Sequence, residues 1–297
     1  MTEKYAVIGQ PISHSRSPAI HAQFAKQTAQ DLSYGAIEIA PAVLAAELQR
    51  LHSEGVRGLN VTLPHKQAVA KLCEAVSERA QLAGAVNTLI RTDSGWVGDN
   101  TDGEGFSADL ARLGFGVAGR RVLVLGAGGA TRGILAPLLA AQPAQLVVSN
   151  RNPWKPEELA ELFKPLGVVT PRTHLALKGD RYDLIVNATS AGHAGGIPML
   201  PGPLLAPGGD CYDLSYCDAH APFARWAASQ GARRCEDGLG MLIEQAASSF
   251  AIWRGVRPET AAVMIDLRAL IESSCVPEAV LPHQPVRHRH VEKPPQD

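Results

Sequence analysis

Short apolar runs alternate with amphipathic segments along the first third of the chain. Apolar runs bounded by Gly, Pro or polar residues predict strands, and apolar residues at helical spacing predict helices. Ser17 followed by Pro18 predicts the start of one helix, and Gly84 predicts the end of another. The predicted strands are 5–9, 34–40, 58–63, 85–91 and 96–102, and the predicted helices are 17–30 and 66–84. This alternation predicts an α/β sheet.

A second α/β unit begins near Gly103. A predicted helix at 104–114 leads into the strand, glycine turn and helix of 120–141. Further strands are predicted at 145–151, 182–192, 209–216 and 232–238, and two helices at 240–255 and 258–274 complete the pattern. From the residues alone, these last helices fit either unit. Residues 277–297 are rich in Pro and charge and predict a disordered tail.

Composition limits the classes of function that the chain can serve. Its 297 residues are enough for two domains of ordinary size. A net charge of −1 argues against a nucleic-acid partner, and the lack of a long apolar stretch argues against a membrane span. The N-terminal residues lack the features of a signal peptide, and the five cysteines form no C-x-x-C pair. We therefore expect a cytoplasmic protein with reduced thiols and no metal site.

The stretch VLVLGAGGATRG predicts a site for a dinucleotide. An apolar strand runs directly into Gly126, Gly128 and Gly129, and a helix follows. Glycines let the backbone approach a pyrophosphate closely, and the helix N-terminus offers free N–H groups to it. Thr131 occupies the third glycine slot of the usual G-x-G-x-x-G pattern. The alternative is a tight strand-to-helix turn without a ligand.

The end of the next strand favours NADP over NAD. An Asp or Glu usually holds the ribose hydroxyl of NAD there, but this chain has Asn150, Arg151 and Lys155 and no acid. A guanidinium can bind a 2′-phosphate through two hydrogen bonds, whereas a carboxylate would repel it. The alternative is that Arg151 and Lys155 are ordinary solvated cations.

Lys66 and Asp102 are candidate reacting groups. Hydride transfer to a ketone creates an alkoxide, which needs a proton donor as it forms. Lys66, at the end of NVTLPHK, could supply that proton, and Asp102 of GDNTDG could orient the ammonium group. By themselves, the two residues could equally be unrelated surface charges.

Eight motifs in a fixed order link the chain to a known family. They are SHSRSP, NVTLPHK, AGAVNT, GDNTDG, GAGGATRG, NATSAG, YDLSY and DGLGMLIEQAA. The chain resembles the shikimate dehydrogenase family over residues 4–272. The resemblance implies the NADP-dependent, reversible reduction of 3-dehydroshikimate to shikimate in the chorismate pathway of aromatic amino acid biosynthesis. It also implies that Lys66 and Asp102 form the catalytic pair.

The resemblance assigns further residues one at a time. Ser15 and Ser17 match the two serines that bind the substrate carboxylate. The other expected substrate contacts are Thr62, Asn87, Tyr216 and Gln245. The expected cofactor contacts are Gly126, Ala127, Gly128, Gly129, Ala130, Asn150, Arg151, Lys155, Thr189, Leu214 and Gly238.

The fold implied by the resemblance is α/β, with two domains that face a cleft. An N-terminal α/β substrate-binding and catalytic domain is expected to comprise residues 1–102 and 239–276. A Rossmann-like NADP-binding domain is expected at 103–238, with the tail at 277–297. The expected partner is the small-molecule substrate, shikimate or 3-dehydroshikimate, and the protein is expected to be a monomer or a homodimer.

Some features leave alternatives open. Asn152 and Lys155 replace a Thr and an Arg that are usual in the family, which predicts weaker NADP binding. One alternative is a quinate/shikimate dehydrogenase that uses NAD, although Ser17 and the basic Arg151 favour shikimate and NADP. Another is a cofactor-binding sensor that has lost catalysis, against which the retained Lys66 and Asp102 argue. The SHSRSP and NTDG motifs argue against a methylenetetrahydrofolate dehydrogenase.

Overall fold

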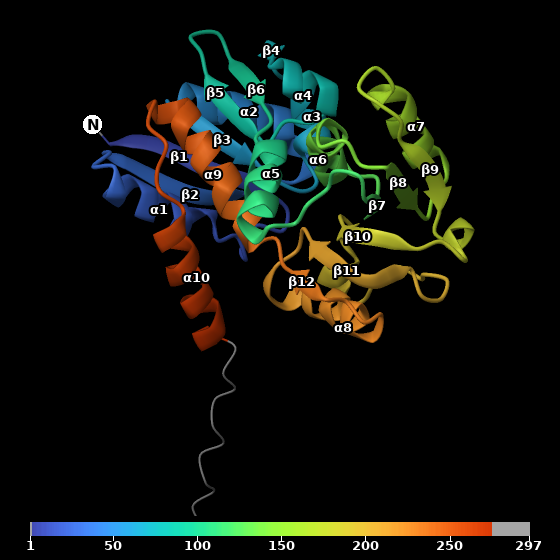
Figure 1. Ribbon diagram of the computed structural model, residues 1–297. Coiled ribbons are helices and arrows are strands. Elements are labelled where there is room, and N and C mark those ends of the chain that lie inside the picture. The colour runs from blue at the N-terminus through green and yellow to red at the C-terminus, as the bar shows by residue number, and fades with distance from the viewer. Residues whose placement is uncertain (1, 275–297) are drawn as a thin grey trace, which may run out of the picture.

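The computed structural model describes residues 2–274 and contains two sheets, each bearing helices (Figure 1). The first sheet has the strand order β2-β1-β3-β5-β6-β4. Its strands are β1 (Glu3–Gly9), β2 (Leu32–Glu38), β3 (Gly58–Val61), β4 (Ala75–Val76), β5 (Thr88–Arg91) and β6 (Trp96–Asp99). The helices of this part are α1 (Ser17–Gln27), α2 (Leu44–Ser53), α3 (Lys66–Ala70) and α4 (Glu78–Ala83), with a 3₁₀ turn η1 (Pro41–Val43).

The second sheet is parallel throughout and has the order β12-β11-β10-β7-β8-β9. Its strands are β7 (Arg121–Leu125), β8 (Gln145–Asn150), β9 (Thr170–Thr173), β10 (Tyr182–Asn187), β11 (Leu205–Asp213) and β12 (Arg234–Glu236). The elements between them are α6 (Gly129–Ala140), α7 (Trp154–Phe163), α8 (Ala221–Ser229), η2 (Leu175–Leu177), η3 (Ala191–Ala194) and η4 (Cys217–Ala219). Read from β9, the order is that of a Rossmann sheet, in which the sequence of strands reverses between β7 and β10.

Two helices that lie side by side connect the sheets (Figure 1). They are α5 (Asp102–Leu113), which leads to the second sheet, and α9 (Leu239–Arg254), which returns from it. A Cβ atom on Gly105 would lie 2.6 Å from the backbone nitrogen of Gln245, so only glycine allows this approach. Beyond the crossing, α9 packs its apolar face on α1, and α10 (Ala261–Ser274) follows it.

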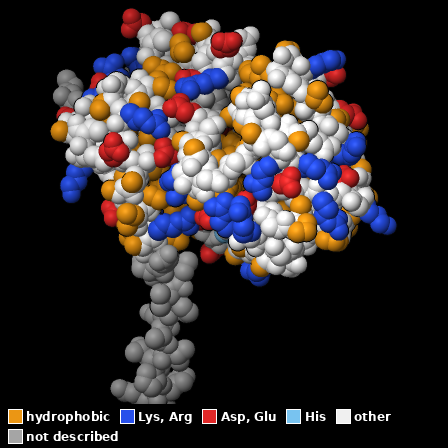
Figure 2. Space-filling view, viewed as in Figure 1, with side chains coloured by type: hydrophobic (Ala, Val, Ile, Leu, Met, Phe, Trp, Pro, Cys, Tyr) orange, Lys and Arg blue, Asp and Glu red, His pale blue; other side chains and the backbone are white. Residues whose placement is uncertain are grey.

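The two sheets have separate cores, as two α/β units require. Ile8, Leu59 and Leu89 are fully buried in the core of the first sheet. Val124 and Leu123, neighbours on β7, belong to two different clusters on the two faces of the second sheet. Figure 2 shows basic and acidic side chains interspersed over one face of the molecule, in agreement with a net charge of −1.

The structure corrects the predicted helix at 66–84. This stretch forms α3, the short strand β4 and α4, because a β-strand and a new helix cap interrupt it. β4 pairs in parallel with β6, and the hydroxyl of Ser77 accepts a hydrogen bond from Ala80 N at 3.2 Å. Ser77 is therefore an N-cap that starts a second helix. The strands predicted at 85–91 and 96–102 form β5 and β6, which pair antiparallel as a hairpin.

His21 on α1 is a buried polar group within an aromatic cluster. Its ring stacks on that of Tyr34, with centroids 4.0 Å apart and planes 4° from parallel. Neither ring nitrogen has a hydrogen-bond partner among the described residues. Burial lowers the pKa of His21 to about 3, so the ring stays neutral in the folded state.

We expect His21 to make stability depend on pH. In the unfolded chain His21 has its ordinary pKa of about 6.5 and takes up a proton below it, while the folded state stays neutral. The stability that the neutral, buried ring contributes is therefore fully present above the unfolded-state pKa and is lost as the pH falls below it. The loss between pH 7.5 and pH 5 should be about 2 kcal/mol in the free energy of unfolding.

Urea unfolding at both pH values can measure this loss. The substitution His21→Phe keeps a planar ring against Tyr34 and should make the pH dependence shallower by that amount. His14→Phe, at an exposed position, should leave the wild-type dependence in place. Equal pH dependence in wild type and His21→Phe would contradict the assignment.

Candidate active site

The carboxyl ends of β3 and β6 bring Lys66 and Asp102 together. β3 and β6 both pair antiparallel with β5, so they run in the same direction and end at the same edge of the sheet. Lys66 begins α3 after β3, and Asp102 begins α5 after β6. Lys66 Nζ lies 2.5 Å from Asp102 Oδ2. The side chains are 15% and 4% exposed, so the ion pair is largely shielded from water.

Two asparagines hold Asp102 in place, one through its carboxylate and one through its backbone. Asn87 Nδ2 donates to Asp102 Oδ1 at 2.8 Å, which leaves Oδ2 for Lys66. Asn100 Oδ1 accepts from the backbone N–H of Asp102 at 3.0 Å, and its own Nδ2 donates to Ala85 O at 2.8 Å. Asp102 also lies in the first turn of α5, where the helix dipole favours a negative charge.

The expected substrate residues are distributed around this pair. Gln245 on α9 reaches it, because its Oε1 accepts from Asn87 Nδ2 at 3.2 Å. Thr62 follows β3 directly, and its backbone oxygen accepts from His65 N at 3.0 Å in the turn that leads to Lys66. His65 itself points away, since its Nε2 lies 2.7 Å from Ile39 O.

Ser15, Ser17 and Tyr216 lie at the start of α1. Ser17 is the first residue of α1 and is buried, and its backbone N–H donates to Ser15 Oγ at 3.3 Å. Tyr216, from the second sheet's side, packs on the apolar cluster that α1 and α9 share. Burial raises the pKa of Tyr216, so its phenol remains a hydrogen-bond donor. Among the described residues, the serines and Tyr216 make no hydrogen bond to Asp102 or Lys66.

The glycine turn after β7 is tight at Gly126 and open at Gly128. Gly126 has φ +103°, and a Cβ on it would lie 2.8 Å from Ala188 O. Gly128 is the N-cap of α6, and nothing lies within 4 Å of where its Cβ would be. Thr131, in the third glycine slot, is buried and donates through Oγ1 to Gly126 O at 3.0 Å. Its hydroxyl therefore braces the turn where a third glycine is usual.

The other expected cofactor residues follow the same edge of the second sheet. Ala127 and Ala130 belong to the turn itself, next to Gly129, whose Cβ would lie 3.6 Å from the Cβ of Lys66. Thr189 donates through Oγ1 to Asn187 Oδ1 at 2.7 Å after β10. A Cβ on Gly238 would lie 2.3 Å from Leu214 O, so these two segments touch after β11 and β12.

The basic loop after β8 is exposed and is shaped by its asparagines. Asn150 Nδ2 donates to Asn152 O at 3.1 Å, and Asn152 Oδ1 accepts from Trp154 N at 3.3 Å. Asn152 thus supplies a local turn where the family usually has Thr. Arg151 and Lys155 are both exposed at the carboxyl edge of the sheet.

Some polar residues near these sites were not predicted from the sequence. His174, after β9, lies 2.8 Å from Ser149 Oγ, and burial together with the charge of Arg151 lowers its pKa. Asn60, Thr88 and Ser249 are buried behind Asn87 and are joined by hydrogen bonds. One indication of this buried polar group was present in the sequence, because Asn60 interrupts the apolar run of β3.

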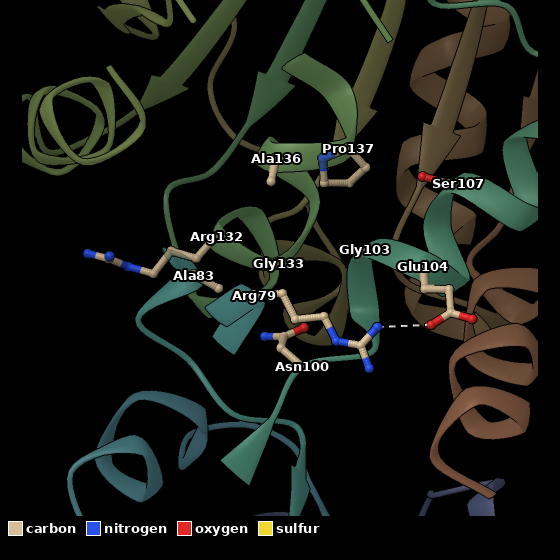
Figure 3. A pocket seen from close by; sticks show the side chains of 10 residues that line it. All are labelled: Arg79, Ala83, Asn100, Gly103, Glu104, Ser107, Arg132, Gly133, Ala136 and Pro137. Carbon is tan, nitrogen blue, oxygen red and sulfur yellow. Dashed lines mark hydrogen bonds and ion pairs between the residues drawn. The ribbon is translucent and has the colours of Figure 1, made fainter. Parts of the chain in front are cut away.

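A cleft of about 180 Å³ lies between α4, α5 and α6 (Figure 3). Arg79 and Glu104 point toward each other at its rim and form an ion pair of 3.0 Å, whereas Arg132 points away. Asn100 reaches this cleft as well as supporting Asp102. Its lining is Arg79, Ala83, Asn100, Gly103, Glu104, Ser107, Arg132, Gly133, Ala136 and Pro137, none of which was an expected site residue.

Comparison with known proteins gives matches along most of the chain. The family model described as "Shikimate dehydrogenase substrate binding domain" matches residues 7–89. "Shikimate / quinate 5-dehydrogenase" matches 109–194, and "Shikimate 5'-dehydrogenase C-terminal domain" matches 238–264. A curated relative from Thioalkalivibrio sulfidiphilus, named shikimate dehydrogenase (NADP(+)), is 51% identical over 90% of this chain and 98% of its own length. The chain belongs to the shikimate dehydrogenase family.

Other members of the shikimate dehydrogenase family agree. The shikimate dehydrogenase (NADP(+)) of Methylococcus capsulatus is 50% identical over 90% of this chain and 96% of its own length. Among solved structures, the Ael1 enzyme from Pseudomonas putida is 44% identical, with a TM-score of 0.80 over 89% of this chain and 98% of its own. The shikimate 5-dehydrogenase of Thermus thermophilus, in complex with NADP(H) and shikimate, is 33% identical, with a TM-score of 0.78 over 90% of this chain and 99% of its own.

These matches confirm the family and the two-part α/β fold that the motifs predicted. Membership in the shikimate dehydrogenase family also removes the methylenetetrahydrofolate dehydrogenase alternative.

Within residues 2–274, no helix is both long and apolar enough to cross a bilayer, and no group of three His, Cys, Asp or Glu residues could hold a metal ion. The predicted tail at 277–297 lies outside the described residues. The roles of single residues stay predictions.

The glycine turn yields a prediction about stability. Gly126→Ala should lower the free energy of unfolding by about 1–3 kcal/mol, because it forces a left-handed backbone on alanine and a clash with Ala188 O. Gly128→Ala, two residues away in open space, should change it by less than about 1 kcal/mol. Urea unfolding of both variants tests this, and equal losses would show that the turn is not strained at Gly126.

Proposed function

We propose that this chain is an NADP-dependent shikimate dehydrogenase, which reversibly reduces 3-dehydroshikimate to shikimate. It would be an oxidoreductase acting on a CH–OH group in the chorismate pathway. The observation that supports this most is the shielded Lys66–Asp102 pair, whose lysine stem faces the dinucleotide turn at Gly129. A proton donor and a hydride carrier would thus reach one substrate from the two units of the chain.

The turn and the basic loop suit NADP. Open space beside Gly128 leaves room for a pyrophosphate, and the N-terminus of the 12-residue helix α6 faces it. Arg151 and Lys155 would hold the 2′-phosphate, and no acid stands at the end of β8 to repel it. When bound, NADPH supplies the hydride.

Lys66 handles the proton in this proposal. As hydride reaches the carbonyl carbon, negative charge grows on the carbonyl oxygen, and Lys66 Nζ gives that oxygen a proton. The resulting amine recovers a proton from solvent. Asp102 keeps the ammonium aimed at the substrate and stabilises its charge at 2.5 Å. In the reverse direction, the neutral amine removes the hydroxyl proton as hydride leaves the same carbon.

The remaining residues bind and orient the substrate. Ser15 and Ser17 would bind its carboxylate at the N-terminus of the 11-residue helix α1, where N–H groups and the helix dipole favour an anion. Thr62, Asn87, Tyr216 and Gln245 would contact its hydroxyl groups. In this proposal residues 1–102 with 239–276 form the substrate domain and 103–238 the NADP domain, in a monomer or homodimer.

Two alternatives within reach of the same site differ in substrate or activity. A quinate/shikimate dehydrogenase using NAD fits less well, because Arg151 follows β8 where an acid would be expected. A sensor without catalysis fits less well, because the Lys66–Asp102 pair is assembled and shielded. If NAD with quinate gave a higher catalytic efficiency than NADP with shikimate, the specificity proposed here would be wrong.

Replacing Lys66 tests the mechanism. Lys66→Ala should lower kcat by a factor of about 10²–10⁴, the usual contribution of a general acid or base, with a small change in KM for shikimate. Lys71→Ala, an exposed lysine just beyond α3, is the matched control and should keep full activity. A Lys66→Ala enzyme with wild-type kcat would remove Lys66 from the reaction.

Replacing Arg151 with Ala tests the choice of cofactor. Loss of charge-assisted hydrogen bonds worth about 1.5–3 kcal/mol should raise KM for NADP roughly 10- to 150-fold and leave KM for NAD nearly unchanged. Lys164→Ala, on the exposed end of α7, should change neither constant. Steady-state kinetics with both cofactors give the answer, and an equal rise in both constants would argue against a 2′-phosphate contact.

A further inference from the structure

We propose that Thr88 and Tyr34 are positioning residues of this reaction, because they help to orient the amide of Asn87 toward Asp102. They do so through a chain of hydrogen bonds, buried except at Tyr34, in which every group donates to the next. The chain runs in the order Tyr34, Asn60, Ser249, Thr88, Asn87 and Asp102. The inference rests on the proposed function, since it concerns the dyad carboxylate.

The last link has one possible direction. The backbone N–H of Thr101 lies 2.9 Å from one end of the Asn87 amide, and an N–H can only donate. That end of the amide must therefore be Oδ1. Nδ2 then faces the carboxylate of Asp102 at 2.8 Å, where only a donor is favourable.

The hydroxyl protons of Thr88 and Ser249 follow from this. Thr88 Oγ1 lies 2.8 Å from Asn87 Oδ1, which can only accept, so Thr88 donates to it. Thr88 has one hydroxyl proton, so at its 2.7 Å contact with Ser249 Oγ the serine must be the donor. The two competing acceptors for the serine proton, Gln245 O and Thr101 Oγ1, are both farther away at 3.1 Å. The opposite choice would leave the two oxygens of Thr88 and Asn87 in contact without a proton between them.

The first links are fixed by a carbonyl group. Asn60 Nδ2 lies 3.1 Å from Asn87 O, an obligatory acceptor, so the nitrogen end of the Asn60 amide faces this way. From there it also donates to Ser249 Oγ at 3.0 Å. Asn60 Oδ1 therefore faces Tyr34, whose phenol donates to it at 2.7 Å. Burial raises the pKa of Tyr34 well above its usual value, which keeps this donor protonated.

A chain with one direction acts on Asp102 as a unit. Asn60, Asn87, Thr88 and Ser249 are nearly or fully buried, so water cannot easily replace a missing link. Aligned hydrogen bonds in such surroundings polarise and strengthen one another. The chain thus keeps an N–H group on Oδ1 of Asp102 and leaves Oδ2 for Lys66.

Three single variants of the full-length protein test the link at Thr88. Thr88→Val has the same shape but no proton to donate, and kcat for shikimate oxidation should fall about tenfold, as expected for one lost hydrogen bond. KM for NADP should be unchanged, because the turn after β7 is not involved. Thr88→Ser restores the hydroxyl and should recover at least half of the wild-type kcat.

Ser248→Ala is the third variant and the matched control for this series. Ser248 is the neighbour of Ser249 on α9, but its hydroxyl contacts Glu244 and Arg257 outside the chain of hydrogen bonds. Its kcat should stay within twofold of wild type. A Thr88→Val enzyme with wild-type kcat, or a Thr88→Ser enzyme no better than Thr88→Val, would overturn the inference.

A double-mutant cycle tests whether Tyr34 acts through Thr88. Tyr34→Phe removes the first donor and should lower kcat about threefold. If the chain acts as a unit, the Tyr34→Phe/Thr88→Val enzyme should be no slower than Thr88→Val alone. Losses that multiply would show independent local effects and would overturn the role of the chain.

The same assays separate this inference from the proposed function. A wild-type protein without NADP-dependent activity on shikimate would refute the function itself. An active wild type whose Thr88 and Tyr34 variants behave like Ser248→Ala would refute only the chain of hydrogen bonds.

Discussion

The contact between Lys66 and Asp102 is the interaction on which the rest of the site depends. Opposite charges that are 15% and 4% exposed lose most of their hydration, and this loss must be replaced by hydrogen bonds from the protein. Asn87 donates such a bond to Oδ1 of Asp102, Lys66 lies at Oδ2, and the helix dipole in the first turn of α5 favours the negative charge. The strands β3, β5 and β6 bring Lys66, Asn87 and Asp102 to one edge of the first sheet. The ion pair therefore forms only when these three strands are paired.

The second sheet approaches Lys66 from the other unit of the chain. Its glycine turn lies next to Lys66, since a Cβ on Gly129 would be 3.6 Å from the Cβ of that lysine, as the proposed function requires. The Rossmann order of strands places the turn at the point where the sequence of strands reverses. Two units with separate cores thus converge on a single small volume.

Much of this was predictable because the responsible residues carry local information. The glycine turn after β7, the absence of an acid after β8 and the order of eight motifs predicted the family, which the comparisons confirmed, and Lys66 and Asp102 as a pair, which the structure brings into contact. The break of 66–84 into α3, β4 and α4 was missed, because helical spacing there hides the cap at Ser77 and the pairing of β4 with β6. Asn60, Thr88 and Ser249 were missed because their partners lie up to 189 positions away, and a polar residue in an apolar run does not name its partner.

The crossing of α5 and α9 at Gly105 has a mechanical consequence. Both covalent links between the two units run through this seam, where Tyr212 of the second sheet also donates to Asp109 of α5 at 2.6 Å. Helices packed this closely resist sliding past each other, so we expect any relative motion of the two units to be a hinge rotation about α5 and α9. Asp102 is the first residue of α5, three residues before Gly105, whereas Arg151 follows β8 of the second sheet. Such a rotation would move the loop after β8 more than it moves Asp102.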